Sequence, residues 1–439
     1  MSSGQQPWGV WGGAESPPTS KSGGGFTPTP RKTGGGFTPT PRKTGGVSTP
    51  PPRYDSGASD WRLEDIDTDE MVLNMGPQHP STHGVLRIEL RTDGEVVRAA
   101  RPHIGYLHRC FEKHAESVDY PGVIPYTDRM DYVASMGNSL GYALAVEKLM
   151  GIEVAPYVQT IRVIVAELQR IASHCVAVGT YGMDIGAFTP FLHLLRDREK
   201  ILDLFEWTCG ARLLYNYNWV GGVSHDLPEG FVRACRQFLR EFDAITFPEL
   251  MDLLVGNKIF VRRTAGVGIC PPELAIAYDL TGPNLRGSGL PRDLRKDQPY
   301  CGYERFEFDA PVGKGQLGPL GSCYDRNWVR CLEMAESSKI IHQALEAIEK
   351  MERTDVREKV PKRVKPPKGE VYFRSEAPRG QLGYYIVSDG VGVNPYRVKV
   401  KSPCFTAMSV FHVLAKGMMI ADIIALIGSL DVVLGEIDR

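Results

Sequence analysis

Two histidines lie on a short segment that follows the Gly-, Pro-, Ser- and Thr-rich N-terminal region. The segment Gly76–Gly84 reads GPQHPSTHG and places His79 and His83 four positions apart. Pro80 and the glycines disfavour a helix, so we expect a rigid loop and no metal site at this pair. A histidine here can donate a hydrogen bond or a proton to a ligand, because its pKa of about 6.5 lies near neutrality. The alternative is a histidine that only stabilises a turn.

The nine cysteines suggest a reducing environment. They are scattered, odd in number and contain no C-x-x-C pair. This pattern argues against a disulfide framework, a zinc ribbon or an iron–sulfur cluster held by this chain. With 42% hydrophobic and 23% charged residues and a net charge of -1, the composition is that of a globular protein and not of one that coats nucleic acid.

The apolar region near the C-terminus is not expected to cross a membrane. Phe405–Leu434 is interrupted by His412, Lys416, Asp422 and Asp431, so no uncharged run approaches the ~18 to 20 residues that a span requires. The N-terminus lacks the pattern of a signal peptide. Any link to a membrane is therefore expected to be made through partners.

The N-terminal region is a low-complexity tail with a tandem repeat. Gly23–Thr33 reads GGGFTPTPRKT, Gly34–Thr44 repeats it, and a decayed copy follows. The tail has too little apolar surface to offset the ordering entropy of roughly 1–2 kcal/mol per residue. We therefore expect residues 1–58 to be disordered. Their Arg-Lys pairs could alternatively touch anionic lipid or an acidic partner.

The elements that must position the histidine loop are strands. Met71–Met75 precedes the loop, and Leu86, Ile88 and Leu90 alternate with charged residues before Asp93–Gly94. A period of two followed by an Asp-Gly turn predicts an antiparallel hairpin. We expect residues 59–125 to form a β-rich subdomain.

Helical periodicity dominates the rest of the chain. An apolar stripe at helical spacing runs from Ile161 to Cys175, and 326–350 also has a helical pattern. Residues 369–385 and 396–400 look strand-like, and a final apolar helix precedes Asp431. The fold class is therefore α+β, with a mainly helical core over 126–439, peripheral β elements and an N-terminal antiparallel sheet.

The chain contains many sequence motifs in the same order as in a known family. They include GPQHPSTHGVLR, PHIGYLHR, PYTDRMDY, RDREKILDLFEW, LRGSG, LGYYIVSDG, PYRVKVKSP and LDVVLGEIDR. Over residues 68–439 the chain resembles the D subunit of NADH-quinone oxidoreductase, the respiratory complex I. That family is similar to a [NiFe]-hydrogenase large subunit without its metal. Arg129–Tyr132 and Asp431–Glu436 lie where the hydrogenase family carries its cysteine pairs.

The resemblance implies a quinone site. His83 matches the histidine that binds the quinone headgroup, and Tyr132 matches the tyrosine on the other side of the headgroup. Asp184 matches the aspartate that pairs with this histidine; the alternative for Asp184 is a helix cap. His79 belongs to the same loop, and Arg109 matches an arginine near the terminal iron–sulfur cluster of a partner subunit. The implied activity is that of a proton-translocating NADH:quinone oxidoreductase.

The resemblance also implies partners and a location. FMN and iron–sulfur clusters are expected on partner subunits, this chain holding no metal or flavin of its own and quinone being the substrate. The partners are expected to include the cluster-bearing small B subunit, the C subunit and the H subunit of the membrane arm. The chain is expected to be peripheral to the inner membrane of the cell, on the cytoplasmic side.

The chain departs from the family pattern at several positions. Before Gly221-Gly222-Val223 the family has a histidine and a second arginine where this chain has Leu214 and Trp219. That histidine is thought to couple reduction of the cluster to protonation, and leucine cannot titrate. Cys110 replaces a glycine, and the chain is shorter than most relatives between Lys350 and Gly369, so a contact there is remodelled or supplied by another chain.

Two other functions compete with this interpretation. A related quinone-reducing complex could take its electrons from ferredoxin, since the chain has no G-x-G-x-x-G motif after a strand to bind NADH. A non-catalytic scaffold protein belongs to a different class, and the set of His83, Tyr132 and Asp184 argues against it. A true hydrogenase would need the paired cysteines that are missing here.

Overall fold

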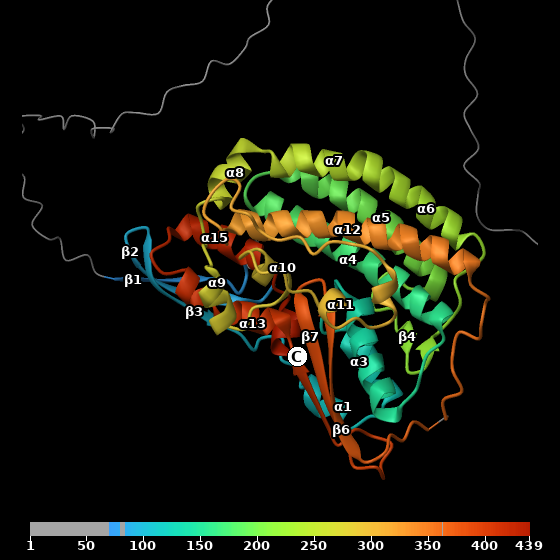
Figure 1. Ribbon diagram of the computed structural model, residues 1–439. Coiled ribbons are helices and arrows are strands. Elements are labelled where there is room, and N and C mark those ends of the chain that lie inside the picture. Colours follow the sequence, from blue (N-terminus) through green and yellow to red (C-terminus); the bar gives the residue numbers. More distant parts are fainter. Residues whose placement is uncertain (1–69, 80–83, 362) are drawn as a thin grey trace, which may run out of the picture. The chain divides into compact units, whose positions relative to one another are not determined.

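The computed structural model describes residues 70–79, 84–361 and 363–439 (Figure 1), which fall in the unit Ile66–Arg439. The tail that we expected to be disordered lies outside the described residues. The expected boundary at residue 125 stays a prediction.

The first sheet forms where the sequence alternates. It contains β1 (Met71–Met75), β2 (Arg87–Asp93) and β3 (Val96–His103) in antiparallel order β1-β2-β3. Ile88 and Leu90 are fully buried, while the alternating charged residues Arg87, Glu89 and Arg91 are partly or fully exposed. The predicted hairpin is confirmed.

Three long helices form the centre of the fold. Figure 1 shows α4 (Pro156–Asp184), α5 (Phe188–Cys209) and α12 (Cys323–Lys350) running beside one another. The predicted apolar stripe is the buried face of α4. Helix α12 begins earlier than expected, because Ser322 and Asp325 form a reciprocal capping box at its N-terminus.

The other helices are shorter. They are α1 (Phe111–Ala115), α2 (Ile124–Asp128), α3 (Ser135–Met150), α6 (Phe231–Glu241), α7 (Phe247–Leu250), α8 (Lys258–Thr264), α9 (Pro272–Ala277), α10 (Gly282–Arg286), α11 (Leu294–Asp297), α13 (Pro403–Ser409), α14 (Phe411–Leu414), α15 (Ile420–Leu430) and α16 (Leu434–Asp438). Short 3₁₀ turns cover Pro121–Val123 and Tyr303–Arg305, and π-helical turns cover Phe242–Thr246 and Met251–Val255. None of the described helices is long and apolar enough to cross a membrane.

A second three-stranded sheet lies late in the chain. It contains β6 (Gly369–Ala377), β7 (Gly380–Ser388) and β8 (Arg397–Lys401), all antiparallel. The stretch 369–385 is thus not one strand but two, joined by a tight turn at Pro378–Arg379. A small hairpin pairs β4 (Asn218–Trp219) with β5 (Gly222–Val223). The α+β class is confirmed, with sheets that are not confined to the N-terminal part.

Candidate functional site around the C-terminal helix

The histidine loop is closed at its base. His79 and Gly84 pair in an isolated antiparallel bridge, while His83 lies outside the described residues. Gly84 has a φ of 126°, and a Cβ built on it would lie 3.1 Å from Cδ1 of Leu434. Glycine is therefore needed there both for its backbone conformation and for its close approach to α16. Gly84, which follows His83 in the sequence, therefore packs against α16.

Tyr132 lies on the short connection between α2 and α3. Its neighbours Met130 and Asp131 are buried, whereas 41% of the Tyr132 side chain is exposed. Burial of the rest of the ring raises the pKa of the phenol above its usual value, and the charge of Asp131 raises it further. The phenol is therefore a neutral donor at physiological pH, at the edge of the buried interior.

The same connection touches α16. A Cβ built on Gly435 would lie 2.6 Å from the carbonyl oxygen of Met130 and 3.3 Å from a guanidinium nitrogen of Arg109. Leu434 and Gly435 are consecutive, so one turn of helix meets both the base of the histidine loop and the segment that carries Tyr132. The base of the histidine loop and the Tyr132 segment therefore meet at this turn of α16.

A buried ionic cluster lies behind Tyr132; we define it as Asp131, Arg379, Asp431 and Glu436. Arg379 donates hydrogen bonds to Oδ2 of Asp131 at 2.6 Å and to Oδ1 of Asp431 at 3.3 Å. Each of the four side chains is less than one tenth exposed. Burial raises the pKa of Asp131, an effect that Arg379 opposes. The cluster therefore joins residues from three distant parts of the chain.

Arg379 is held in place by a close contact between two backbones. It lies at the turn between β6 and β7, directly before Gly380. A Cβ built on Gly282 would lie only 2.3 Å from Cα of Gly380, and the hydroxyl of Thr281 accepts a hydrogen bond from the backbone N–H of Gln381 at 3.0 Å. This contact fixes the turn, and the turn directs the guanidinium into the cluster.

Arg109 is positioned by the C-terminus. The Asp438 carboxylate accepts hydrogen bonds from the backbone N–H groups of Gly105 and Leu107, both at 2.8 Å. The Arg109 guanidinium donates to the carbonyl oxygen of Arg129 at 2.7 Å. No carboxylate among the described residues forms an ion pair with Arg109, so its charge is fixed in place but not neutralised by a partner in the described part of the chain.

Asp184 lies on a different element. It is the half-buried last residue of α4, three positions before Ala187, the N-cap of α5. Tyr181, one turn earlier, packs against Gly428 of α15, the helix that leads to Asp431. The structure therefore brings the Tyr132 segment and Arg109 to the same helix, α16, and it places Asp184 at the end of a helix that packs on α15.

Sequence reasoning missed Arg379, Glu436 and Cys404. Cys404 is buried on α13, and its sulfur accepts a hydrogen bond from the backbone N–H of Val433 at 3.5 Å. For Asp131 and Glu436 a signal existed, since they lie in Arg129–Tyr132 and Asp431–Glu436, the two segments that the sequence resemblance singled out. For Arg379 the only local signal was the Pro-Arg-Gly turn. No described group of three or more His, Cys, Asp or Glu side chains is arranged to hold a metal ion.

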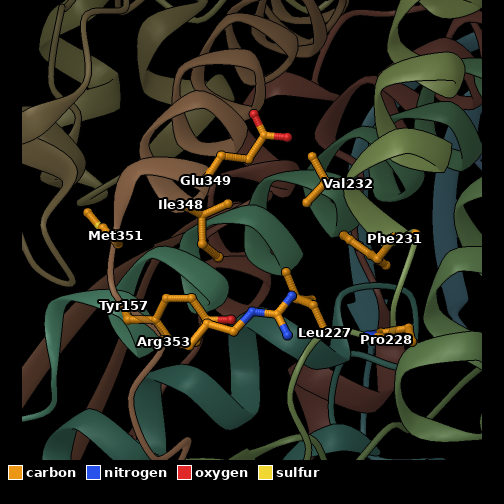
Figure 2. A pocket seen from close by; sticks show the side chains of 10 residues that line it. Tyr157, Leu227, Pro228, Phe231, Val232, Ile348, Glu349, Met351 and Arg353 are labelled. Carbon is orange, nitrogen blue, oxygen red and sulfur yellow. The ribbon is translucent and has the colours of Figure 1, made fainter.

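A separate cavity of about 310 Å³ lies away from these residues (Figure 2). Its walls come from the starts of α4 and α6 and from the end of α12, and include Tyr157, Leu227, Phe231, Ile348, Met351 and Arg353. In Figure 2 the Arg353 side chain lies beside Tyr157, while Glu349 points away from it. None of the predicted site residues lines this cavity, so we do not assign it to the same site.

Comparison with known proteins gives one consistent match. The family model described as "Respiratory-chain NADH dehydrogenase, 49 Kd subunit" matches residues 184–439. A protein of Chlorobium luteolum, named as the D subunit of NADH-quinone oxidoreductase, is 55% identical over 376 residues, which are 86% of this chain and 95% of the relative. Proteins of the same name from Chlorobaculum parvum and Prosthecochloris aestuarii are 54% and 52% identical, each over 86% of this chain and 94% of the relative.

The cluster predicts a large difference between two arginine substitutions. Arg379→Gln leaves the Asp131 and Asp431 carboxylates buried without their shared counter-ion, so we expect a loss of about 3–5 kcal/mol of unfolding free energy. The matched control is Arg397→Gln, which removes ion pairs of a partly exposed arginine with Glu112 and Glu116 and should cost about 0–1 kcal/mol. Urea unfolding of the purified variants measures both, and equal losses would contradict the role of Arg379.

Proposed function

The chain belongs to the family of the 49-kDa subunit, also named the D subunit, of respiratory-chain NADH-quinone oxidoreductase, and on that basis we propose that Tyr132 and His83 form the quinone-reducing site of this enzyme. The chain is a subunit of an oxidoreductase complex of the complex I type. It carries the quinone-site role of its family within that assembly.

One observation supports the location of the site. Leu434 lies against Gly84, next to His83, and Gly435 lies against Met130, two residues before Tyr132. The histidine loop and the tyrosine segment are far apart in sequence but share one turn of α16. This shared turn supports the proposal that the two donors act on one substrate.

Two donors match the chemistry of the substrate. Reduction of a quinone to a quinol takes two electrons and two protons, and negative charge develops on the two carbonyl oxygens as electrons arrive. A neutral phenol at one oxygen and an imidazole at the other stabilise this charge and can then donate their protons. The raised pKa of Tyr132 keeps its proton in place until the quinone becomes basic.

The remaining predicted residues have supporting roles in this proposal. The Asp184 carboxylate holds the tautomer of His83 and increases its basicity, and His79 closes the base of the loop. The Arg109 cation favours the reduced form of an iron–sulfur cluster on a partner subunit. It suits this role because its guanidinium is anchored by the carbonyl of Arg129 and has no carboxylate partner in the described part of the chain.

The wider assembly follows from the family. Other subunits of the complex are the partners, and we propose that they include the cluster-bearing small B subunit, the C subunit and the H subunit of the membrane arm. Electrons from NADH reach the site through FMN and iron–sulfur clusters of those partners. We further propose that the chain is peripheral to the inner membrane on its cytoplasmic side. The ferredoxin-driven and scaffold alternatives gain no support from the matched relatives, which are named NADH-quinone oxidoreductases.

The central prediction concerns the Tyr132 phenol. In membranes that carry Tyr132→Phe, NADH:quinone reductase activity should fall by at least about 100-fold, because a general acid is lost. Oxidation of NADH with an artificial acceptor should remain normal, and His83→Ala should give the same pattern. The matched control is Tyr126→Phe, which changes a nearby tyrosine of similar exposure that stacks on His114. Normal quinone reduction by both site variants would show that the assignment is wrong.

A second prediction concerns the position of the missing histidine. Leu214 cannot titrate, so the reduction potential of the partner's cluster should be nearly independent of pH between about 6 and 8. The backbone N–H of Asn216, two residues after Leu214, donates to Oδ2 of Asp128 at 2.6 Å, and burial raises the pKa of Asp128 to about 7. Asp128 is therefore the group that would produce a slope in this pH range if the prediction is wrong.

Redox titration of the cluster in the purified complex at several pH values tests this prediction. A clear slope would contradict it. If Asp128→Asn abolished such a slope, the Asp128 carboxyl would be identified as the substitute for the histidine.

A further inference from the structure

Glu436 carries a buried carboxyl group that no strong donor among the described side chains binds. It lies on α16 and is 1% exposed. Apart from a weak interaction with the Cys404 thiol, neither of its oxygens has a hydrogen-bond partner in the described part of the chain. Buried polar groups are almost always hydrogen-bonded, because desolvation without compensation is costly. Such a carboxyl at the centre of a proposed proton-transfer site therefore requires a functional explanation or a neutral state.

Charged and titratable groups surround Glu436 from every element packed against it. Asp131 faces it from the α2–α3 connection, next to Tyr132, and the other groups are Arg379 from the β6–β7 turn, Tyr384 from β7, Cys404 from α13 and Asp431 from the end of α15. Arg330 of α12 also approaches Oδ2 of Asp431, at 3.6 Å.

The charge balance decides the state of Glu436. If Arg330 is counted together with the cluster, a neutral Glu436 leaves two carboxylates (Asp131 and Asp431) facing two guanidinium groups (Arg379 and Arg330), and the net charge of these buried groups is zero. Ionised Glu436 would add one uncompensated negative charge in a dry interior. Asp131 accepts hydrogen bonds from Arg379 at 2.6 Å and from the backbone N–H of Val133 at 3.2 Å, so it is Asp131 that stays ionised and Glu436 that holds the proton.

We propose that Glu436 is the proton donor that restores Tyr132 after the phenol has given its proton to the quinone. This inference rests on the proposed function, because it needs Tyr132 to act as the acid. The buried cluster then becomes a proton store within this subunit, joined to the reacting phenol by two shared neighbours, Asp131 and Cys404.

The steps balance in atoms and charge. The quinone takes two electrons from the partner subunits, and the Tyr132 O–H bond breaks as its proton moves to a quinone oxygen, which leaves a tyrosinate. The Glu436 carboxylic acid then loses its proton and the tyrosinate gains it, so that a phenol and a carboxylate remain. One proton from water restores Glu436.

Proton transfer from Glu436 to the tyrosinate of Tyr132 is favourable in free energy. Burial, together with the charge of Asp131, raises the pKa of Glu436 to about 8, which is below that of the Tyr132 phenol. The thiol of Cys404 lies close enough to influence both groups, and burial raises its pKa well above the usual value. It therefore stays protonated, and it can pass a proton on by donating its own to the tyrosinate and accepting that of Glu436.

The experiment compares Glu436→Gln with the native residue in the assembled, purified complex. Glu436 is protonated below pH about 8 and ionised above it, so native quinone reduction should decline above that pH. Glu436→Gln should reduce quinone about tenfold or more slowly at pH 7, since glutamine cannot supply a proton, and should lack the alkaline decline. NADH oxidation with an artificial acceptor should be unchanged. Infrared spectroscopy should show the carbonyl stretch of a protonated carboxyl that is lost in Glu436→Gln.

The outcomes separate this inference from the function on which it rests. If Tyr132→Phe abolishes quinone reduction but Glu436→Gln keeps the native rate and pH profile, the proton-store inference is overturned and the quinone site stands. If Tyr132→Phe is fully active, both are overturned. Should Glu436→Gln fail to assemble, Glu436→Asp replaces it: a shifted alkaline decline supports the inference, and an unchanged profile overturns it.

Discussion

The geometry of the site depends on one buried guanidinium. Arg379 bridges Asp131, which precedes Tyr132, and Asp431, which precedes the C-terminal helix. Each carboxylate would be too costly to bury alone, and together they make burial of the arginine tolerable. Because α16 in turn carries the contacts to Gly84 and Met130, the ion pairs of Arg379 fix the helix that brings the histidine loop and the tyrosine segment together.

The cluster also determines the electrostatics next to Tyr132. In the two segments Arg129–Tyr132 and Asp431–Glu436, this chain has carboxylates that pair with arginine. The charges cancel only while Glu436 is protonated. In our proposal this polar interior next to Tyr132 exchanges a proton, which suits a substrate that takes up protons together with electrons.

The local pattern of the sequence predicted the elements better than it predicted the cluster. Period-two alternation at Ile88 and Leu90 identified the first hairpin, and the stripe from Ile161 identified α4. The position of Arg379 could not be predicted in this way, because it depends on a backbone contact between Gly282 and Gly380 about a hundred residues apart. The start of α12 was predicted too late, at residue 326, because the capping box formed by Ser322 and Asp325 was not recognised in the sequence. Long-range ion pairs leave no periodic signal.

The most direct test of the account is a cryo-electron microscopy structure of the assembled complex with bound quinone. The account predicts one headgroup oxygen within hydrogen-bond distance of the Tyr132 hydroxyl and the other facing His83, with α16 beneath both residues. A headgroup bound elsewhere, with Tyr132 covered by a partner subunit, would contradict it.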